Sequence, residues 1–455
     1  MQYSTFAAID IGSYDVILEI FEISKKQGIR SVDKICHRME LGKDTYTLGK
    51  IRPEMEEELC RVLADFVRIM EGYRVDDYRA TASSAISEAS NSLYVLGKIH
   101  QLTGLSVTVL SNSEQRFLGY KALAAMEDNF NKIIEKGTAI LDLDGGSFQI
   151  SLFDKDALVT TQNIRMGSLR IRERLAGIQS ETEHYEEMVE ELIWNEVSSF
   201  KKMYLKDRKI ENIMLIGDVF TDSVYQNIEE KTTKIISREN FNTWYEKIIR
   251  QSPMELAVKL GIPLENASLM YPSAVIYKCL IDMMGAEHIW IPGVHMTRGI
   301  AYEYAEQMKL LKGGHNFEND ILMAAKNIGK RYAVNRPHVQ NLEMTALAMF
   351  DATKKMHGMK ERERLLLQMA VMLHDVGKYI SFNNVADSSY NIIMSNEIIG
   401  LSHIEREMVA LIARYNTVTL PSYDELVMES SLSAEQYLTV SELTAIVRLA
   451  NALDR

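Results

Sequence analysis

Two short stretches of the chain each place an aspartate between an apolar run and a glycine-containing turn. Asp10 holds this position in residues 8–21, and Asp142 holds it in residues 139–153. A carboxylate at the end of a buried strand can bind a metal ion or orient a water molecule, while the free backbone N–H groups of such a turn can bind phosphate. The turn residues expected to bind phosphate are Gly12, Ser13, Gly145, Gly146 and Ser147.

The two stretches repeat one pattern, in which an apolar run ends at the aspartate, turns, and leaves as a second alternating run. Such a pattern predicts a strand, a tight turn and a second strand. The copies lie about 130 residues apart, which indicates duplicated domains with a phosphate site in the cleft between them. We therefore predict that Asp10 and Asp142 face each other across one cleft. The alternative is that each aspartate only caps its own turn.

The chain has 455 residues, of which 46% are apolar, so it fits two or three domains with sizeable cores. Its net charge of −12 argues against a broad nucleic-acid or membrane surface. We expect small anions or other proteins as partners, including a second copy of the chain in a homodimer. No apolar run reaches the length of a membrane span, and we expect no signal peptide. The three scattered cysteines are typical of a reduced, cytoplasmic protein.

The order of the predicted elements supports this division. The predicted strands of the first copy are residues 3–10, 15–23 and 30–37. A helix that begins at Pro53 follows them, as in a ribonuclease-H-like domain, and residues 138–163 repeat the three strands. Further helices are predicted over residues 84–102, 181–203 and 267–284. Beyond a predicted linker at residues 313–316 the pattern becomes helical only. The predicted domains are residues 1–125, 126–312 and 313–455.

In order and spacing, five motifs make the chain resemble the exopolyphosphatase and guanosine pentaphosphate phosphohydrolase family over essentially its whole length. The motifs are residues 10–13, 81–89, 114–116, 142–147 and 374–375. The resemblance implies an α/β fold with two ribonuclease-H-like domains of the actin or sugar-kinase type, followed by an all-α HD-type domain. Compared with longer family members, we expect this last domain to be truncated at its C-terminus, after Arg455. The activity implied is release of terminal phosphate from polyphosphate or pppGpp.

The resemblance also implies roles for single residues. Glu114 occupies the position of the general base, while Asp10 and Asp142 would hold Mg²⁺ or Mn²⁺ together with the attacking water. Arg116 would bind the phosphate chain beside the two turns. The residues alone leave a second interpretation of Glu114 open, because a glutamate in the first turn of a helix also stabilises that helix by complementing its dipole.

The chain departs from the family pattern around the expected phosphate site. Ser87 replaces an arginine, Gln149 replaces a carboxylate and Asp144 replaces a glycine, while Asp15 and Asp218 add negative charge. A carboxylate a few ångströms from a phosphate repels it by about 1 kcal/mol in water unless a metal ion lies between them. Two hypotheses follow. One is a phosphoanhydride hydrolase with a degenerate phosphate site, and the other is a catalytically weak or inactive member that acts as a nucleotide- or phosphate-binding regulatory protein.

The predicted helical domain carries a separate set of metal-binding residue types. His338, His374 and Asp375 match the HD metal motif, and a pair of imidazoles with a carboxylate suits a divalent transition metal. The usual last ligand position holds Asn451, and only Asp454 offers a carboxylate nearby. We expect the first three side chains to converge without completing a ligand set. The alternative to a metal centre is a vestigial site on a retained helical scaffold.

Overall fold

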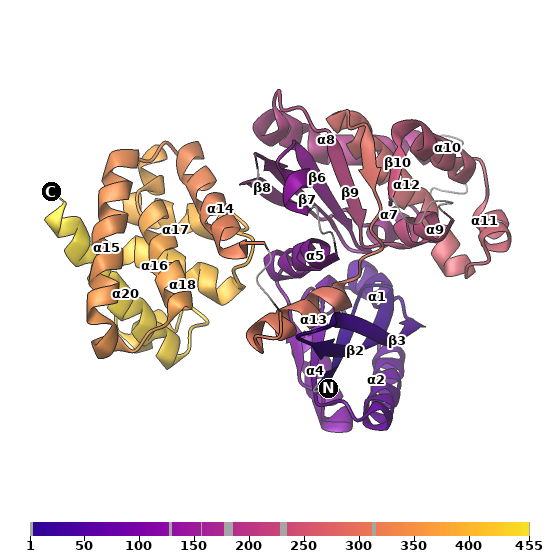
Figure 1. The fold of residues 1–455 in the computed structure, drawn as a ribbon, viewed down its shortest axis with the longest axis horizontal. Coiled ribbons are helices and arrows are strands. Elements are labelled where there is room, and N and C mark those ends of the chain that lie inside the picture. Colours follow the sequence, from indigo (N-terminus) through magenta and orange to yellow (C-terminus); the bar gives the residue numbers. More distant parts are fainter. Residues whose placement is uncertain are drawn as a thin grey trace. The chain divides into compact units, whose positions relative to one another are not determined.

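The computed structural model describes residues 3–126, 130–155, 157–176, 185–227, 234–311 and 315–454. It divides into two compact units, one formed by residues 1–157 and 162–315 and the other by residues 158–161 and 316–455. The first unit contains two lobes, each built on a β-sheet, and the second unit is helical (Figure 1). None of the helices in these described segments is long and apolar enough to cross a membrane.

The first lobe is built on a five-stranded sheet in the order β3-β2-β1-β4-β5. The strands are β1 (Ser4–Ile11), β2 (Asp15–Ser24), β3 (Gly28–Arg38), β4 (Asp77–Ala82) and β5 (Val107–Val109). Strand β1 lies antiparallel to β2 and parallel to β4, and β4 lies parallel to β5. Three antiparallel strands extended by parallel ones form a ribonuclease-H-like sheet, so the predicted three-strand opening is confirmed.

Strand β1 sends alternate residues to the two faces of this sheet. The helices around the sheet are α1 (Leu41–Leu48), α2 (Pro53–Tyr73), α3 (Ser84–Ser87), α4 (Ser92–Thr103), α5 (Asn112–Met126) and α13 (Met296–Gln307). Ile9 and Ile11 enter a buried cluster with residues of α2 and α4. Phe6 and Ala8 enter a second cluster with residues of α5 and α13. Asp10 follows Phe6 and Ala8 at a spacing of two residues, so it lies on the face of the sheet covered by α5 and α13, near the carboxyl end of β1.

The second lobe repeats this sheet with one strand added. Its strands are β6 (Thr138–Leu143), β7 (Phe148–Asp154), β8 (Ala157–Ile164), β9 (Asn212–Ile216), β10 (Ile235–Ser237) and β11 (His288–Trp290). The order β8-β7-β6-β9-β11 matches β3-β2-β1-β4-β5, and β6 pairs antiparallel with β7 and parallel with β9, as β1 does with β2 and β4. The predicted duplication is confirmed. The short edge strand β10 has no counterpart in the sequence prediction.

Seven α-helices and one π-helical segment are described in the second lobe. They are α6 (Phe130–Ile134), α7 (Ser168–Leu175), α8 (Tyr185–Phe200), η1 (Lys201–Leu205), α9 (Val219–Asn227), α10 (Arg238–Ile249), α11 (Pro253–Leu260) and α12 (Leu264–Met284). Helices α8 and α12 correspond to the helices predicted over residues 181–203 and 267–284. The first four residues of the former prediction lie outside the described part of the chain.

The single helix predicted over residues 84–102 is two helices, α3 and α4. Asn91 lies in the break between them and uses its side chain to bind a neighbouring loop. Its Oδ1 accepts the N–H of Ile51 at 3.0 Å, and its Nδ2 donates to the carbonyl of Ile51 at 2.8 Å. Asparagine side chains compete with the backbone hydrogen bonds of a helix in this way. The tertiary contact therefore ends the helix where the local pattern would continue it.

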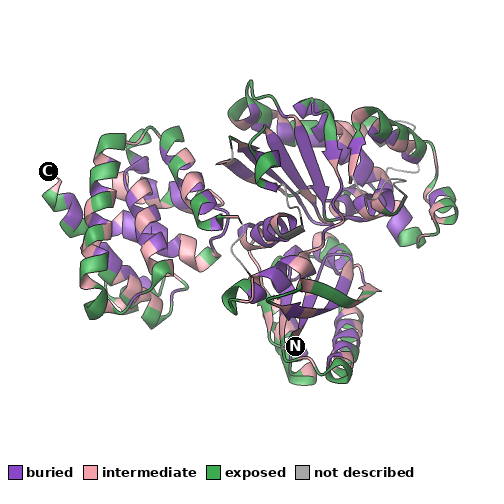
Figure 2. Cartoon of the chain, in the orientation of Figure 1, coloured by how far each residue is buried: buried purple, intermediate pink, exposed green. Residues whose placement is uncertain are grey.

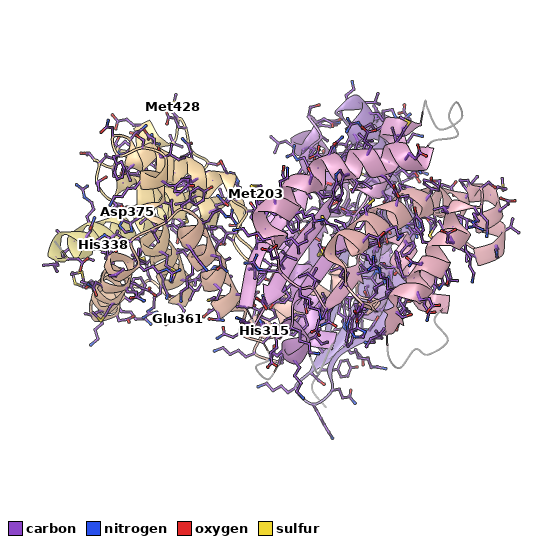
Figure 3. The ribbon with its side chains drawn as sticks, turned by 90° about the horizontal axis from the view of Figure 1, so that it is seen from above. Met203, His315, His338, Glu361, Asp375 and Met428 are labelled. Carbon is purple, nitrogen blue, oxygen red and sulfur yellow. The ribbon has the colours of Figure 1, made fainter. Side chains whose placement is uncertain are left out.

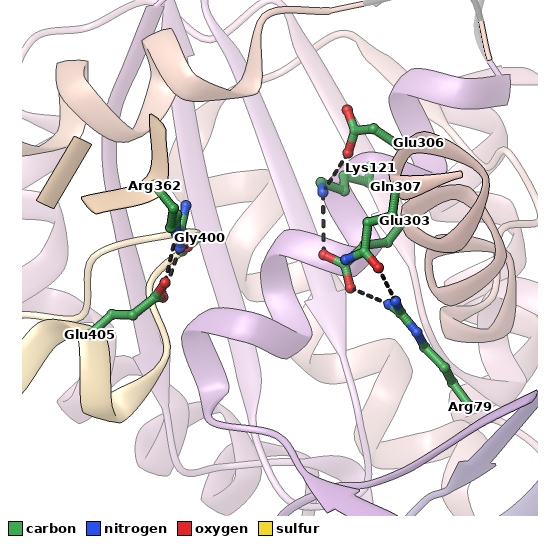
Figure 4. A network of polar contacts seen from close by, with 8 residues as sticks. All are labelled: Arg79, Lys121, Glu303, Glu306, Gln307, Arg362, Gly400 and Glu405. Atoms are coloured by element: carbon green, nitrogen blue, oxygen red, sulfur yellow. Dashed lines mark hydrogen bonds and ion pairs between the residues drawn. The ribbon is translucent and has the colours of Figure 1, made fainter. Parts of the chain in front are cut away.

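Helix α13 belongs to the stretch predicted for the second domain but packs on the sheet of the first lobe. The ring of Tyr304 stacks on that of Phe6 with 4.1 Å between the centroids. Glu303 accepts a hydrogen bond from Arg79 at 2.9 Å and pairs with Lys121 at 3.3 Å (Figure 4). The assignment of α13 to the second domain therefore does not follow the packing, while the helical unit resumes at residue 316, close to the predicted boundary at residue 312. The chain returns to the first lobe through α13, which joins both lobes in one unit.

The second unit is helical in its described residues beyond 315. Its helices are α14 (Phe317–Arg331), α15 (Arg336–His357), α16 (Glu361–Leu373), η2 (Val376–Tyr379), α17 (Val385–Ser395), α18 (His403–Tyr415), α19 (Tyr423–Leu426) and α20 (Ala434–Leu453). Buried residues gather between these helices (Figure 2). Arg362 joins α16 to α18 by donating to the carboxylate of Glu405 at 2.6 and 2.7 Å (Figure 4). The all-α prediction is confirmed, while residues 313 and 314 of the predicted linker lie outside the described residues.

Candidate active site

A cavity of about 180 Å³ lies between the first strands of the two lobes. Asp10 from β1 and Asp142 from β6 both line it, so the structure brings the two predicted aspartates to one cleft. The reason is the duplication, because each aspartate occupies the matching position near the end of the first strand of its lobe. The carboxylate residues in the lining are Asp10, Asp15, Asp142, Asp144 and Asp222.

Burial and mutual repulsion raise the pKa values of these carboxyl groups. Burial raises the pKa of Asp10 to about 8, and the neighbouring charges of Asp15 and Asp144 act in the same direction. Burial likewise raises the pKa of Asp142 to about 7 and that of Asp15 to about 6, although Arg38 opposes the shift at Asp15. The charged forms of these groups lack sufficient positive charge around them. A set made only of carboxylate oxygens is the ligand set that Mg²⁺ or Mn²⁺ prefers.

The first turn uses its polar groups within the protein. The N–H of Gly12 donates to the carbonyl of Asp15 at 2.8 Å. The hydroxyl of Ser13 is buried and lies 2.7 Å from the hydroxyl of Tyr46, which in turn lies 2.9 Å from the hydroxyl of Ser84. Gly12 lines the cavity, but its N–H is already engaged. This arrangement does not offer phosphate the donor that the sequence pattern predicts there.

The second turn is also closed by internal hydrogen bonds. The N–H of Gly145 donates to Oδ1 of Asp144 at 2.6 Å. The N–H of Asp144 donates to the carbonyl of Ser147 at 2.9 Å. A Cβ at Gly146 would lie 2.1 Å from the hydroxyl oxygen of Tyr46. The glycines of this turn therefore let the two lobes approach closely. Among the described residues, the cavity lining does not include Gly145, Gly146 or Ser147.

Glu114 lies away from the aspartate cavity. Its carboxylate accepts hydrogen bonds from the N–H of Ser111 at 2.9 Å and from the hydroxyl of Ser111 at 2.6 Å, which caps the beginning of α5. It lines a different cavity, together with Arg79 and Glu303. The role of general base predicted for Glu114 thus lacks a geometric basis here. The sequence does carry the signal for a cap, since a serine three residues before a glutamate forms a capping box.

Gln115 is the residue of α5 that the sequence pattern misses. It lines the aspartate cavity, and its side chain hydrogen-bonds to Asp144. Successive residues of a helix point about 100° apart, so the residue next to Glu114 faces the cavity while Glu114 does not. A carboxamide here can donate to one group and accept from another.

Arg116 also points away from the cavity lining. Its Nε donates to the Oε1 of Gln149 at 2.7 Å, and the residue is only 3% exposed. Its positive charge lowers the pKa of Asp142 and so partly opposes the effect of burial. The structure therefore places the arginine predicted to bind phosphate behind Asp142, where it supports that carboxylate.

Three of the residues expected to disturb phosphate binding are not in the cavity lining, namely Ser87, Gln149 and Asp218. Ser87 is exposed on α3. Asp218 caps α9, because its Oδ1 accepts the N–H of Thr221 at 3.1 Å. Burial raises the pKa of Asp218 to about 7. The added negative charge in the cavity therefore comes from Asp15 and Asp144.

Two arginines of α7 join the lobes across the cleft, and no motif of the sequence predicts them. Arg172 binds both carboxylate oxygens of Glu40, at 2.7 and 2.8 Å. Arg170 donates to Glu88 at 2.9 Å, and its guanidinium lies 3.9 Å from the centre of the ring of Tyr46. Such bidentate and stacked contacts are the ones for which arginine is suited. They connect the two lobes directly.

In the helical unit, the three predicted metal-binding residues converge. The Nε2 atoms of His338 and His374 lie 3.2 Å apart, and Oδ1 of Asp375 lies 3.4 Å from Nε2 of His374. Ligand atoms of all three lie within 4.8 Å of one another. Figure 3 labels His338 and Asp375, which come from separate segments of this unit. The predicted convergence is confirmed.

The outer nitrogens of the two imidazoles are fixed by other partners. Nδ1 of His338 lies 2.5 Å from Oδ2 of Asp454, and Nδ1 of His374 donates to the carbonyl of Val371 at 2.7 Å. Each Nδ1 thus carries the proton and each Nε2 presents a lone pair to the cavity, as in metal-binding histidines. Asn451, at the usual last ligand position, lines the same cavity of about 390 Å³.

Two lobes that repeat one sheet and bring a carboxylate from each first strand to a shared cavity define an actin-like fold, here followed by a helical unit. Residues 20–308 match the model of the Ppx/GppA phosphatase family, and residues 322–455 match the model of Ppx/GppA phosphatase, domain III. The chain belongs to the Ppx/GppA phosphatase family.

Individual relatives are distant. The chain is 18% identical to the guanosine-5'-triphosphate,3'-diphosphate pyrophosphatase of Vibrio atlanticus over 97% of its own length and 86% of that protein. It is 21% identical to a bifunctional 3-dehydroquinate synthase/phosphatase of Fusobacterium nucleatum over 62% of its length, and it spans 44% of that protein.

Solved structures of the family show the same fold. An exopolyphosphatase from Cytophaga hutchinsonii aligns with a TM-score of 0.60 and 17% identity, over 68% of this chain and 100% of that one. The Ppx/GppA family member from Aquifex aeolicus aligns with a TM-score of 0.55 and 17% identity, over 68% of this chain and 99% of that one. At these identities the likeness concerns the fold alone.

Proposed function

We propose that this chain hydrolyses the terminal phosphoanhydride bond of polyphosphate or pppGpp in the cavity between its two lobes. The observation that carries the proposal is that Asp10 and Asp142, from matching strands of duplicated lobes, line one cavity. Relatives named as a pppGpp pyrophosphatase and an exopolyphosphatase suggest these substrates. Membership of a phosphatase family favours turnover over the alternative of a silent regulatory protein.

The residues of the cavity fit a divalent cation. Asp10 and Asp142, with Asp15 and Asp144 beside them, offer hard oxygen ligands in a place where positive charge is lacking. We assign Mg²⁺ or Mn²⁺ to these carboxylates. When bound, such an ion would neutralise the phosphoryl oxygens and remove the repulsion that the aspartates otherwise exert on them.

The chain's own residues supply the positioning. Gln115, in contact with Asp144 and facing the cavity, orients the attacking water, and one of the aspartate carboxylates accepts the proton that this water loses. Phosphoryl transfer passes through a loose transition state, so positioning and charge stabilisation contribute more than a strong base does. Glu114 is engaged at its helix cap and takes no part in this scheme. Arg116 acts on Asp142 and not on phosphate.

We infer further that the helical unit is HD-type and that His338, His374 and Asp375 bind a divalent transition metal. Support comes from the two Nε2 lone pairs, which lie 3.2 Å apart and repel each other unless a cation lies between them. Metal analysis of the purified protein tests this. Stoichiometric metal that is lost in His374→Asn is expected, and wild-type protein that stays metal-free after incubation with Mn²⁺ or Zn²⁺ would contradict it.

A cytoplasmic location is also part of the proposal. Cys36, Cys60 and Cys279 are free thiols, as expected in a reducing compartment. If pppGpp is the substrate, the reaction would serve the stringent response of a bacterium.

Phosphate release measured with malachite green tests the proposed function. Polyphosphate and pppGpp are supplied separately, each with Mg²⁺, with Mn²⁺ or with a chelator. We expect release from at least one substrate with metal and none with the chelator. Release that is insensitive to the chelator would contradict the metal assignment, and no release from either substrate would contradict the function.

A further inference from the structure

The aspartate cavity has a second wall that carries two cationic side chains and an imidazole. Lys34 and Arg38 on β3 line it, together with His295, the residue before α13. None of these three residues belongs to a motif that the sequence pattern identifies. Basic residues on an exposed edge strand are common, so their sequence positions alone carry no signal.

The register of the sheet fixes where this wall lies. Asp10 pairs with Ile17 on β2, and Ile17 pairs with Cys36 on β3. Lys34 and Arg38 stand two residues before and after Cys36 and therefore share its face. Two strand spacings of about 4.8 Å put this wall about 10 Å from Asp10. The cavity thus has an acidic end at Asp10 and Asp142 and a wall on which basic groups stand beside Asp15 and Asp222.

The basic groups differ in how they are held. Arg38 donates to Asp15 at 3.0 Å, and Nε2 of His295 lies 3.6 Å from Oδ1 of Asp222. Lys34 is exposed and makes no ion pair within the described part of the chain. A lysine amine in this position can bind an incoming anion without first breaking an ion pair.

We propose that Lys34, Arg38 and His295 bind the second and third phosphoryl groups of a phosphate chain whose terminal group lies at the aspartates. This inference rests on the proposed function and specifies its substrate class as the metal-complexed end of a short oligophosphate. The aspartates and this wall line one cavity, so the end of such a chain can contact both at once. The wall replaces the arginine that the family pattern puts at the exposed Ser87.

Calorimetric titration in the presence of Mg²⁺ tests this proposal with two probes, non-hydrolysable imidodiphosphate and orthophosphate. Lys34→Met should weaken the affinity for imidodiphosphate about tenfold, because one charge-assisted contact is lost. Its affinity for orthophosphate should change less than about twofold, since a single group binds at the acidic end. Lys34 is exposed, so the variant should fold normally. Lys26→Met, an equal charge change at an exposed position outside the cavity lining, is the matched control.

Three results would overturn the proposal. They are an unchanged affinity of Lys34→Met for imidodiphosphate, an equal loss in Lys26→Met, and no binding of imidodiphosphate to the wild-type protein. The proposed hydrolysis is judged separately by phosphate release. If the wild-type protein binds imidodiphosphate through Lys34 but releases no phosphate, the proposed binding role of this wall stands and the proposed hydrolysis is contradicted. If the protein releases phosphate but Lys34 does not contribute to imidodiphosphate binding, the hydrolysis stands and the binding role of the wall is contradicted.

Discussion

The Nε of Arg116 donates a hydrogen bond of 2.7 Å to the Oε1 of Gln149, and both side chains are buried. Gln149 on β7 lies opposite Asp142 on β6, one strand away from the cavity carboxylate. The charge of Arg116 lowers the pKa of Asp142 against the larger effect of burial. Arg116 and Gln149 therefore support the carboxylate of Asp142 from the side away from the cavity. The sequence pattern instead suggests that Gln149 marks the loss of a catalytic carboxylate.

Removing the acceptor of this hydrogen bond should destabilise the protein. Gln149→Leu should lower the free energy of unfolding by about 1–3 kcal/mol, because a buried donor loses its partner. Gln149→Glu keeps an acceptor and adds an opposite charge, so it should cost less. Denaturant unfolding of the metal-free proteins measures both variants. Equal losses would mean that shape, and not the hydrogen bond, is what Gln149 contributes.

Glu114→Gln and Gln115→Leu should differ in their effect on phosphate release. Because Glu114 caps α5 outside the aspartate cavity, its variant should stay within about threefold of the wild-type rate, far from the 10²–10⁴-fold or so that loss of a general base costs. Gln115→Leu removes the group assigned to orient water and should lower the rate about tenfold or more. Steady-state assays of both variants decide between the two residues. A large loss in Glu114→Gln would restore the base role and contradict this assignment.

The stability of the metal-free protein should fall as the pH rises. The folded pKa values of Asp10 and Asp142, about 8 and about 7, lie above the value of about 4 for an unfolded aspartate. Their stabilising contribution is therefore complete below about pH 4 and is lost as the pH rises through about 8. We expect a lower melting temperature at about pH 8 than at about pH 5, and a weaker dependence in Asp10→Asn.

Adding Mg²⁺ should raise the melting temperature more at the higher of these pH values, because the ion binds the charged carboxylates. Thermal scans with and without the ion check this. A stability that rises steadily between the two pH values in the stripped protein would argue against the buried carboxylate cluster.

Gly146→Ala should disturb the contact between the lobes. A Cβ there would lie 2.1 Å from the hydroxyl oxygen of Tyr46 and 2.5 Å from that of Ser84, so overpacking of about 1–3 kcal/mol is expected. Gly97→Ala is the matched control. A Cβ at Gly97 meets nothing within 4 Å in the middle of α4, so that change should stabilise by about 0.5–1 kcal/mol. The two variants should therefore shift the melting temperature in opposite directions. A lower melting temperature in both would mean that the loss in Gly146→Ala is not specific to the contact between the lobes.

Much of the fold follows from local pattern. The apolar runs that end at Asp10 and Asp142 predict the central strands and their duplication, because a buried strand needs a continuous apolar sequence. The return of α13 to the first lobe is not predictable in this way, since its place depends on Tyr304 meeting Phe6, far away in the chain. The helix break at Asn91 likewise depends on a partner 40 residues away.

The candidate site is predictable only in part for the same reason. The two aspartates follow from the repeated turns, but which residues of β3 lie beside them depends on the register of strand pairing, which the sequence does not show. Gln115 and Glu114 are adjacent on α5, and only the directions of their side chains differ. The side chain of Gln115 faces the cavity, while that of Glu114 caps the helix. The glycine turns predict a phosphate site, whereas in the structure Gly146 lies against Tyr46.

The measurement that tests the central claim most directly is Mg²⁺-dependent phosphate release from polyphosphate and pppGpp by the wild-type protein, Asp142→Asn and Asp65→Asn. Asp65 is an exposed residue of α2 outside the cavity and serves as the control. We predict that Asp142→Asn loses about 10²-fold or more of the wild-type rate, because a metal- and water-holding carboxylate is gone, while Asp65→Asn keeps it. A wild-type rate in Asp142→Asn would contradict the claim and place the hydrolytic site outside the cavity between the lobes.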